Sequence, residues 1–285
     1  MTYAGEKREF DRKYEHQELQ AGGGLFRYVL AGEPKKGDLV FLNGGMDLPE
    51  MWMRCADALA EGFRVLLFEY PLELKKNRDL VSGMHEFFAA LGIERPVLIG
   101  EGYGGMLAQL YVQRFPEETG GLILLSTGAL DKETLKDLKK EYTFAPLMLL
   151  YMRFCNYGKL KKKWIETGVG YACHESRDNR AYAQEFWESV MEDYTRERDL
   201  HVTSLMGDVR KQKPLTEKDF RALEGKILLI APRDDYFSQE DKDKLGSLMH
   251  RPKLYCIRGG QMATVLHSED YVRAIRKFME DPAFA

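Results

Sequence analysis

Residues 97–106 read Val-Leu-Ile-Gly-Glu-Gly-Tyr-Gly-Gly-Met, a short apolar run followed by a glycine-rich turn and the start of a helical pattern. This order predicts a buried strand that turns sharply into a helix. A turn of the form G-x-S-x-G presents a serine hydroxyl at its centre, whereas the central residue here is Gly102. The turn chemistry is therefore intact, and the side chain that would attack a substrate is missing.

Short apolar runs alternate with helical patterns along most of the chain, which is typical of a mostly parallel sheet with helices on both faces. We expect strands at Phe26–Leu30, Leu39–Leu42, Val65–Phe68, Val97–Ile99, Leu122–Leu125, Ile227–Ile230 and Leu254–Ile257. We expect helices at Glu50–Leu59, Leu80–Leu91, Gly105–Arg114, Gln239–Leu248 and Ser268–Met279. Between residues 129 and 224 no strand pattern appears, and helical periodicity covers Asp131–Tyr142, Pro146–Phe154 and Asn179–Arg196.

The motifs follow one another in the order found in the α/β-hydrolase superfamily, which the chain resembles from about residue 38 to its end. Residues 39–45, Leu-Val-Phe-Leu-Asn-Gly-Gly, resemble the strand and His-Gly loop that supply one oxyanion-hole amide, with Asn43 in place of histidine. Residues 100–105, Gly-Glu-Gly-Tyr-Gly-Gly, resemble the G-E-S-Y-G-G turn of proline-iminopeptidase-like hydrolases and esterases. The resemblance implies an α/β-hydrolase fold, with a core at residues 1–128 and 225–285 and a helical cap at residues 129–224.

The same resemblance assigns the remaining catalytic positions. The loop after the strand at 227–230 carries the triad acid in such enzymes, and the spacing favours Asp235, with Asp234 as the second choice. The final Gly-x-Gly-His motif is replaced by Arg-Gly-Gly-Gln at 258–261, which puts Gln261 on the histidine position. An amide does not take up a proton near neutral pH. The oxyanion and pocket residues implied by the resemblance are Asn43, Gly44, Gly45 and Tyr103, with Asp47 and Asp234 beside them.

Two functions remain open. The first is a non-catalytic protein that binds a small molecule or a protein partner in the old pocket, a divergence similar to that of maspardin and of the N-myc downstream-regulated family. The second is an active ester or amide hydrolase in which water attacks with help from Asp235 or Asp47, the oxyanion being held by the Gly45 and Tyr103 amides. Loss of both nucleophile and base makes ordinary serine catalysis the weaker expectation.

The cap interval contains an apolar group and a basic group. Nine residues form the apolar group, and we expect them to pack the cap onto the core, with a pocket lining as the alternative: Phe144, Leu147, Met148, Leu150, Tyr151, Met152, Phe154, Tyr157 and Trp164. Lys159, Lys161, Lys162 and Lys163 are interpreted as a solvated helix face rather than a site for an anionic ligand or membrane surface.

Gly100, Gly102 and Gly105 also satisfy the G-x-G-x-x-G fingerprint of dinucleotide-binding proteins. That fold needs an acidic residue after the next strand, but the next strand here is followed by Ser-Thr-Gly at 126–128. We therefore expect no cofactor. No histidine or cysteine spacing fits a metal site, so no metal is expected either.

The composition limits the remaining classes. With 285 residues, 44% of them hydrophobic and 31% charged, the chain is long enough for one large core. A net charge of −3 gives no reason to expect nucleic-acid binding. Residues 1–14 are polar and lack the apolar core of a signal peptide, and the apolar stretch at 144–152 is too short to span a membrane. Four scattered cysteines fit a reduced protein, so we expect a cytoplasmic location and no membrane partner; the oligomeric state stays open.

Overall fold

The computed structural model describes residues 2–249 and 251–284. Within these residues the centre of the molecule is a sheet of eight strands in the order β1-β2-β4-β3-β5-β6-β7-β8. The strands are β1 (His16–Ala21), β2 (Gly24–Ala31), β3 (Asp38–Leu42), β4 (Arg64–Phe68), β5 (Val97–Glu101), β6 (Gly121–Leu125), β7 (Ile227–Pro232) and β8 (Lys253–Ile257). β1 and β2 are antiparallel to their neighbours, and the pairs from β4 to β8 are parallel.

Parallel strands at the centre of the sheet are buried on both faces, which explains their continuous apolar sequences. All five residues of β6 are buried. Leu42 of β3 pairs with Gly100 of β5, and Glu101 of β5 pairs with Leu125 of β6. The loops that follow these strands therefore leave the sheet at one common edge.

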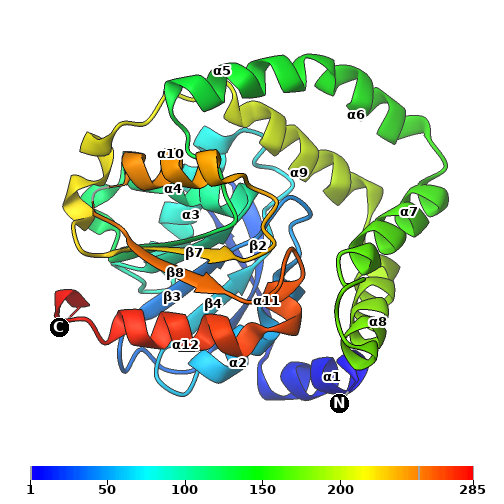
Figure 1. The fold of residues 1–285 in the computed structure, drawn as a ribbon, viewed down its shortest axis with the longest axis horizontal. Helices are drawn as coiled ribbons and strands as arrows, with labels where there is room; N and C mark the ends of the chain where they lie inside the picture. The colour runs from blue at the N-terminus through cyan, green and yellow to red at the C-terminus, as the bar shows by residue number, and fades with distance from the viewer. Residues whose placement is uncertain (1, 250, 285) are drawn as a thin grey trace.

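Helices cover both faces of the sheet (Figure 1). One face packs on α2 (Met53–Leu59) and α12 (Ser268–Met279), and the other on α3 (Asn77–Ala90), α4 (Tyr103–Arg114) and α10 (Gln239–Leu248). Shorter helical segments are η1 (Pro49–Trp52), η2 (Pro116–Glu118), η4 (Glu217–Leu223), α11 (Ala263–Leu266) and η5 (Pro282–Phe284). This is the α/β-hydrolase fold expected from the sequence.

A helical insertion separates β6 from β7. It consists of α5 (Lys132–Glu141), η3 (Tyr142–Phe144), α6 (Ala145–Phe154), α7 (Tyr157–Gly170), α8 (Arg177–Asp193) and α9 (Arg196–Val209). Figure 1 shows that these helices form an arch over one end of the sheet, with α1 (Tyr3–Lys13) beside α8. Four of the helices begin at a capping side chain that accepts a backbone N–H: Asp131, Asn156, Ser176 and Thr195.

The seven strands expected from the sequence are all present, each within a few residues of its expected bounds. The longer elements that were not expected are α1, β1, α7 and α9, and the short segments η2, η4, α11 and η5 were not expected either. The expected helix at Asn179–Arg196 is wrong at its end, because α8 stops at Asp193 and Thr195 caps a new helix. β1 was missed because its side chains are mostly exposed on an edge strand and carry no apolar run.

Candidate functional site

Gly102 forms the turn between β5 and α4. Its backbone angles are φ 54° and ψ −117°, a conformation that strains any residue with a Cβ. The Gly102 N–H donates to the carbonyl oxygens of Leu125 and Ser126, and Thr127 Oγ1 donates to the Gly102 carbonyl over 2.6 Å. Among the described residues, and apart from its chain neighbours, the one atom within 4 Å of a Cβ built on Gly102 is Ser126 O at 3.9 Å. The turn is thus fixed by the end of β6, and space remains for a larger side chain at its centre.

The start of α4 lies directly against the end of β3. A Cβ on Gly104 would overlap with the carbonyl group of Leu42, so only glycine fits at this position. Tyr103 is the first residue of α4, and its N–H has no acceptor within the helix. Gly44 lies next to the end of β5, because a Cβ built on Gly44 would be 3.6 Å from the carbonyl oxygen of Glu101. The loop after β3 and the turn at Gly102 therefore lie side by side.

The loop after β3 is held by Asn43, which is fully buried. Its Nδ2 donates to Asp47 Oδ1 and to Phe68 O, both over 2.7 Å, and its carbonyl oxygen accepts from Tyr70 Oη over 2.7 Å. Asn43 therefore shapes the loop. The next residues, Gly44 and Gly45, pass beneath the insertion, and a Cβ built on Gly45 lies 3.1 Å from Met206 Sδ of α9.

Asp47 has an environment that the sequence did not indicate. The exposed fraction of Asp47 is only 1%. Its Oδ2 accepts from Tyr70 N over 3.1 Å and from Arg198 Nε of α9 over 3.3 Å, and Arg198 also binds the Asp47 carbonyl. Burial raises the pKa of Asp47 to about 7, although Arg198 and Asn43 act in the opposite direction. Asp47 thus links the loop to the helical insertion.

Asp235 and Asp234 follow β7 on the neighbouring loop. The Asp235 side chain is 2% exposed, accepts the Phe237 N–H over 3.2 Å and lies 3.4 Å from Lys242 Nζ. Asp234 is exposed, and its N–H donates to Gly259 O, which joins the two loops after β7 and β8. Of the two, Asp235 has the buried environment of a side chain that can orient a neighbour.

Glu101 lies immediately before the turn; the residue is partly exposed, but its Oε2 is buried. Burial, reinforced by the nearby charge of Asp235, raises the pKa of Glu101 to about 8. Its Oε2 has no hydrogen-bond partner among the described residues. The carboxyl groups of Glu101 and Asp235 thus interact electrostatically beside the turn.

Gln261 and His267 occupy the loop and helix start after β8. Within the described part of the chain, Gln261 makes no hydrogen bond to Asp235, whose contacts are Phe237 N and Lys242. His267 is the N-cap residue of α12 but makes no side-chain capping hydrogen bond; it is half-buried, and its Nε2 lies 2.8 Å from Glu175 Oε1, in the loop between α7 and α8. The one imidazole of this loop is therefore paired with the insertion.

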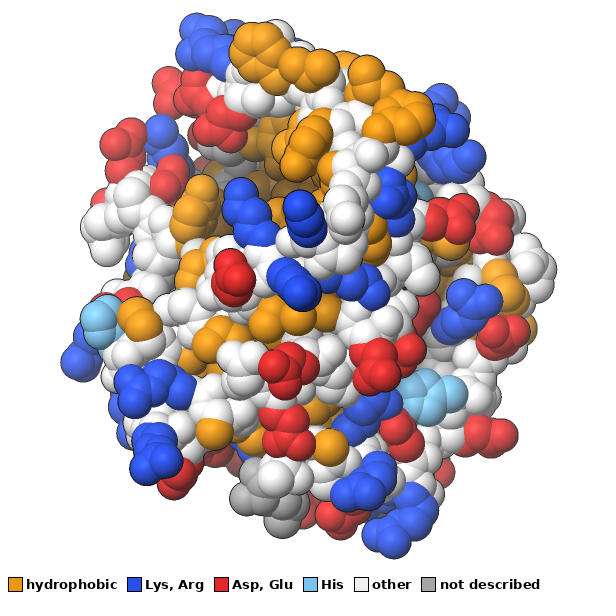
Figure 2. All heavy atoms as spheres, turned by 90° about the vertical axis from the view of Figure 1, so that its right-hand side faces the viewer, with side chains coloured by type: hydrophobic (Ala, Val, Ile, Leu, Met, Phe, Trp, Pro, Cys, Tyr) orange, Lys and Arg blue, Asp and Glu red, His pale blue; other side chains and the backbone are white. Residues whose placement is uncertain are grey.

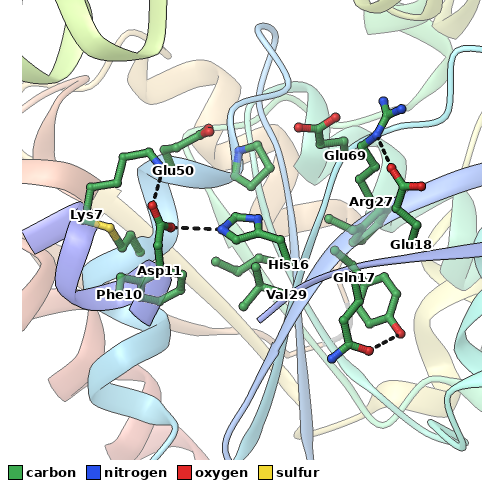
Figure 3. A pocket seen from close by; sticks show the side chains of 15 residues that line it. Lys7, Phe10, Asp11, His16, Gln17, Glu18, Arg27, Val29, Glu50 and Glu69 are labelled. Carbon is green, nitrogen blue, oxygen red and sulfur yellow. Dashed lines mark hydrogen bonds and ion pairs between the residues drawn. The ribbon is translucent and has the colours of Figure 1, made fainter. Parts of the chain in front are cut away.

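Two cavities lie beside this region. The first, about 390 Å³, lies between the core loops and helices α8 and α9, and its walls include Leu48, Tyr70, Tyr194 and Arg198. The second, about 310 Å³, is bounded by α1, β1, β2 and η1 (Figure 3). The sequence did not mark either cavity, because part of each wall comes from α1, β1 or α9, which were not predicted.

The second cavity combines an apolar floor with charged walls. Figure 3 shows Asp11 bound to both Lys7 and His16, at 2.7 and 3.0 Å. In this view Glu50 lies beside Lys7 and Glu69 lies beside Arg27, and Glu50 Oε2 has no hydrogen-bond partner among residues 2–249 and 251–284. In the same residues, no group of three or more His, Cys, Asp or Glu side chains is arranged to hold a metal ion.

Known proteins share this architecture. Residues 39–274 match the family model described as Alpha/beta hydrolase family. No curated protein sequence matches the chain. Among solved structures, it is similar to a membrane phospholipase A described as a bacterial virulence factor (18% identity, 98% and 90% of the two chains, TM-score 0.71). It is also similar to an enol-lactonase from Burkholderia xenovorans, with 13% identity over 93% of this chain and 100% of that chain and a TM-score of 0.72. A third similar structure is an esterase from Thermogutta terrifontis, with 14% identity over 92% of this chain and 98% of that chain and a TM-score of 0.71. At these identities the likeness concerns the fold.

Proposed function

The chain belongs to the alpha/beta hydrolase family, and we propose that it is a member without serine-hydrolase catalysis that binds a small molecule between the core and the helical insertion. The turn at Gly102 carries this proposal. Its backbone has the form that presents a nucleophile, it has room for a side chain, and it offers no atom that attacks a carbonyl.

The lack of a base supports the same conclusion. Gln261 stands on the position that the family's motif gives to histidine, and its amide does not accept a proton. His267 is engaged by Glu175 of the insertion. In serine hydrolases, removal of the nucleophile or the base lowers kcat by about 10⁶.

Binding is supported by the cavity beside the loop after β3. At about 390 Å³ it falls in the range of small-molecule sites, and helices α8 and α9 of the insertion form one of its walls. Arg198, Tyr70 and Tyr194 line this cavity, and the Tyr194 hydroxyl has no hydrogen-bond partner among the described residues. A protein partner that covers the same surface is the other form of this proposal.

The test is hydrolysis of a panel of activated esters and anilides by the wild-type protein and by the double variant Gly102→Ser/Gln261→His. Gly102→Ala/Gln261→His is the matched control, because it adds a Cβ and an imidazole without a hydroxyl. A fluorophosphonate probe reports an activated serine independently of the substrate. We expect no turnover by the wild type or the control, and turnover and labelling by the serine variant.

Turnover by the wild type would overturn the proposal and favour the alternative, an active hydrolase that uses water and a loop carboxylate. Asp47 and Asp235 are then the residues to change to asparagine. Asp47 has a pKa near 7, which suits a general base, but both of its carboxylate oxygens already accept hydrogen bonds. Because these hydrogen bonds occupy the Asp47 carboxylate, we prefer the proposal of a non-catalytic binding protein.

A further inference from the structure

Helix α6 is apolar around almost its whole circumference but is covered along only one narrow strip. Ala145 and Met152 are its buried residues. The expectation that the apolar side chains of this segment pack the cap onto the core, or line a pocket, is wrong for six residues that are 44–77% exposed: Phe144, Leu147, Met148, Leu150, Tyr151 and Phe154. Only the strip of α6 that contains Met152 packs on the rest of the molecule.

An apolar helix of this kind is normally covered by protein or lipid. Single exposed apolar residues are common on protein surfaces, but a contiguous group of large ones marks an interaction surface. Six such side chains within eleven consecutive positions form a contiguous group. Figure 1 places α6 on the outer side of the arch, away from the sheet.

The surroundings of α6 are strongly basic. Residues 139–163 contain seven Lys and Arg and one acidic residue, Glu141, a net charge of +6 in a chain whose net charge is −3. Lys159, Lys162 and Lys163 of α7 are exposed. Figure 2 shows hydrophobic side chains gathered at the top of this face, with Lys and Arg beside and below them.

We propose that α6 and the lysines of α7 form a peripheral binding surface for an anionic lipid membrane. The apolar face of α6 would enter the boundary between headgroups and acyl chains, and the lysines would contact the headgroup phosphates and carboxylates. No helix in the described residues is long and apolar enough to cross a membrane. With ten residues, α6 is about 15 Å long and lies in one leaflet.

This surface differs from the expectation drawn from the sequence, which interpreted the lysines as a solvated face and included no membrane partner. The sequence did not show that the apolar residues next to the lysines are exposed. The uncovered apolar helix fits the acyl chains of a membrane, and the cationic helix beside it fits anionic headgroups. The proposal does not depend on the state of the site at Gly102.

The test uses the full-length protein in flotation assays with phosphatidylcholine vesicles, with and without phosphatidylserine. We expect binding to the anionic vesicles that weakens at high salt. The triple variant Lys159→Glu/Lys162→Glu/Lys163→Glu should lower the partition coefficient by about a hundredfold, because each lysine near an anionic surface contributes on the order of 1 kcal/mol. Lys35→Glu/Lys218→Glu/Lys277→Glu, an equal charge change at exposed positions elsewhere, should have a much smaller effect.

The apolar part is tested by Leu147→Ser/Leu150→Ser/Phe154→Ser, with circular dichroism to verify folding. Because these side chains are exposed, the variant should fold and fail to float with vesicles. Absence of wild-type binding to anionic vesicles would refute the proposal, as would equal losses in the two lysine variants. Concentration-dependent self-association that the serine variant abolishes, without flotation, would show that a second copy covers α6 instead.

Discussion

Arg198 of α9 and Asp47 of the loop after β3 join the helical insertion to the core, with Arg198 Nε 3.3 Å from Asp47 Oδ2. The Arg198 side chain also reaches Glu69 over 3.0 Å and is 17% exposed, whereas Asp47 is 1% exposed. Removal of one partner of a buried pair leaves the other charge without compensation, which costs more than the pair itself contributes.

Replacing Arg198 with methionine is therefore expected to lower the free energy of unfolding by about 3–5 kcal/mol. The double variant Arg198→Met/Asp47→Asn should recover a large part of this loss, since the asparagine carries no charge. Urea denaturation of the single and double variants measures the difference. Arg27→Met removes an exposed pair with Glu18 and should change stability by less than about 1 kcal/mol. Equal losses in Arg198→Met and Arg27→Met would contradict the role given to the buried pair.

Gly102 is expected to stabilise the turn because it adopts a positive φ without strain. Gly102→Ser and Gly102→Ala should each lower the free energy of unfolding by about 1–3 kcal/mol. Since an added Cβ has open space here, the loss reflects backbone strain alone. Thermal unfolding of both variants measures it; a melting temperature equal to or above that of the wild type would show that the turn is not strained.

The sequence predicts the sheet well because its central strands are buried on both faces. A run such as Leu122–Leu125 has no stable alternative to a buried strand, so its position is clear from the residues alone. The turn at Gly102 is predicted for a similar reason, because a strand, glycines and a helix pattern follow without a gap.

Contacts between distant segments could not be predicted. Asp47 and Arg198 are 151 residues apart, and His267 and Glu175 are 92 residues apart, so no local pattern connects them. The exposure of α6 was missed for a different reason. An apolar helix is usually buried, and the sequence does not show that the insertion leaves one side of this helix uncovered.

Two glycine-to-alanine substitutions are expected to have opposite effects on stability. One of the glycines lies at the contact between α4 and β3, and the other lies in α10 with space around it. In Gly104→Ala the new methyl group meets the backbone of Leu42, which cannot move aside as a side chain can. We expect a loss of more than about 3 kcal/mol or failure to fold. Apart from its own helix backbone, no atom of residues 2–249 and 251–284 lies within 4 Å of a Cβ built on Gly246 of α10, so Gly246→Ala should stabilise the protein by about 0.5–1 kcal/mol. Chemical denaturation of both variants decides; a harmless Gly104→Ala would refute the close packing.

Glu101 is expected to make stability fall as the pH rises. Burial, with the Asp235 charge, raises its pKa from 4.5 to about 8 in the folded protein. Below pH 4.5 the folded and unfolded states both hold the proton, and no cost arises. Between pH 4.5 and about 8 the unfolded state releases the proton while the folded state keeps it, so stability declines across this window and levels off above it.

Glu101→Gln removes this titration and keeps the shape of the side chain. It should therefore stabilise the protein above pH 8 relative to the wild type, by up to about 5 kcal/mol, since each pKa unit corresponds to 1.36 kcal/mol. The advantage should shrink as the pH falls and disappear near pH 4.5. Free energies of unfolding measured from pH 4 to 9 test this, with the exposed Glu94→Gln as the control. A constant difference between Glu101→Gln and the wild type across that range would show that the pKa of Glu101 is the same in the folded and unfolded states, and would refute this prediction.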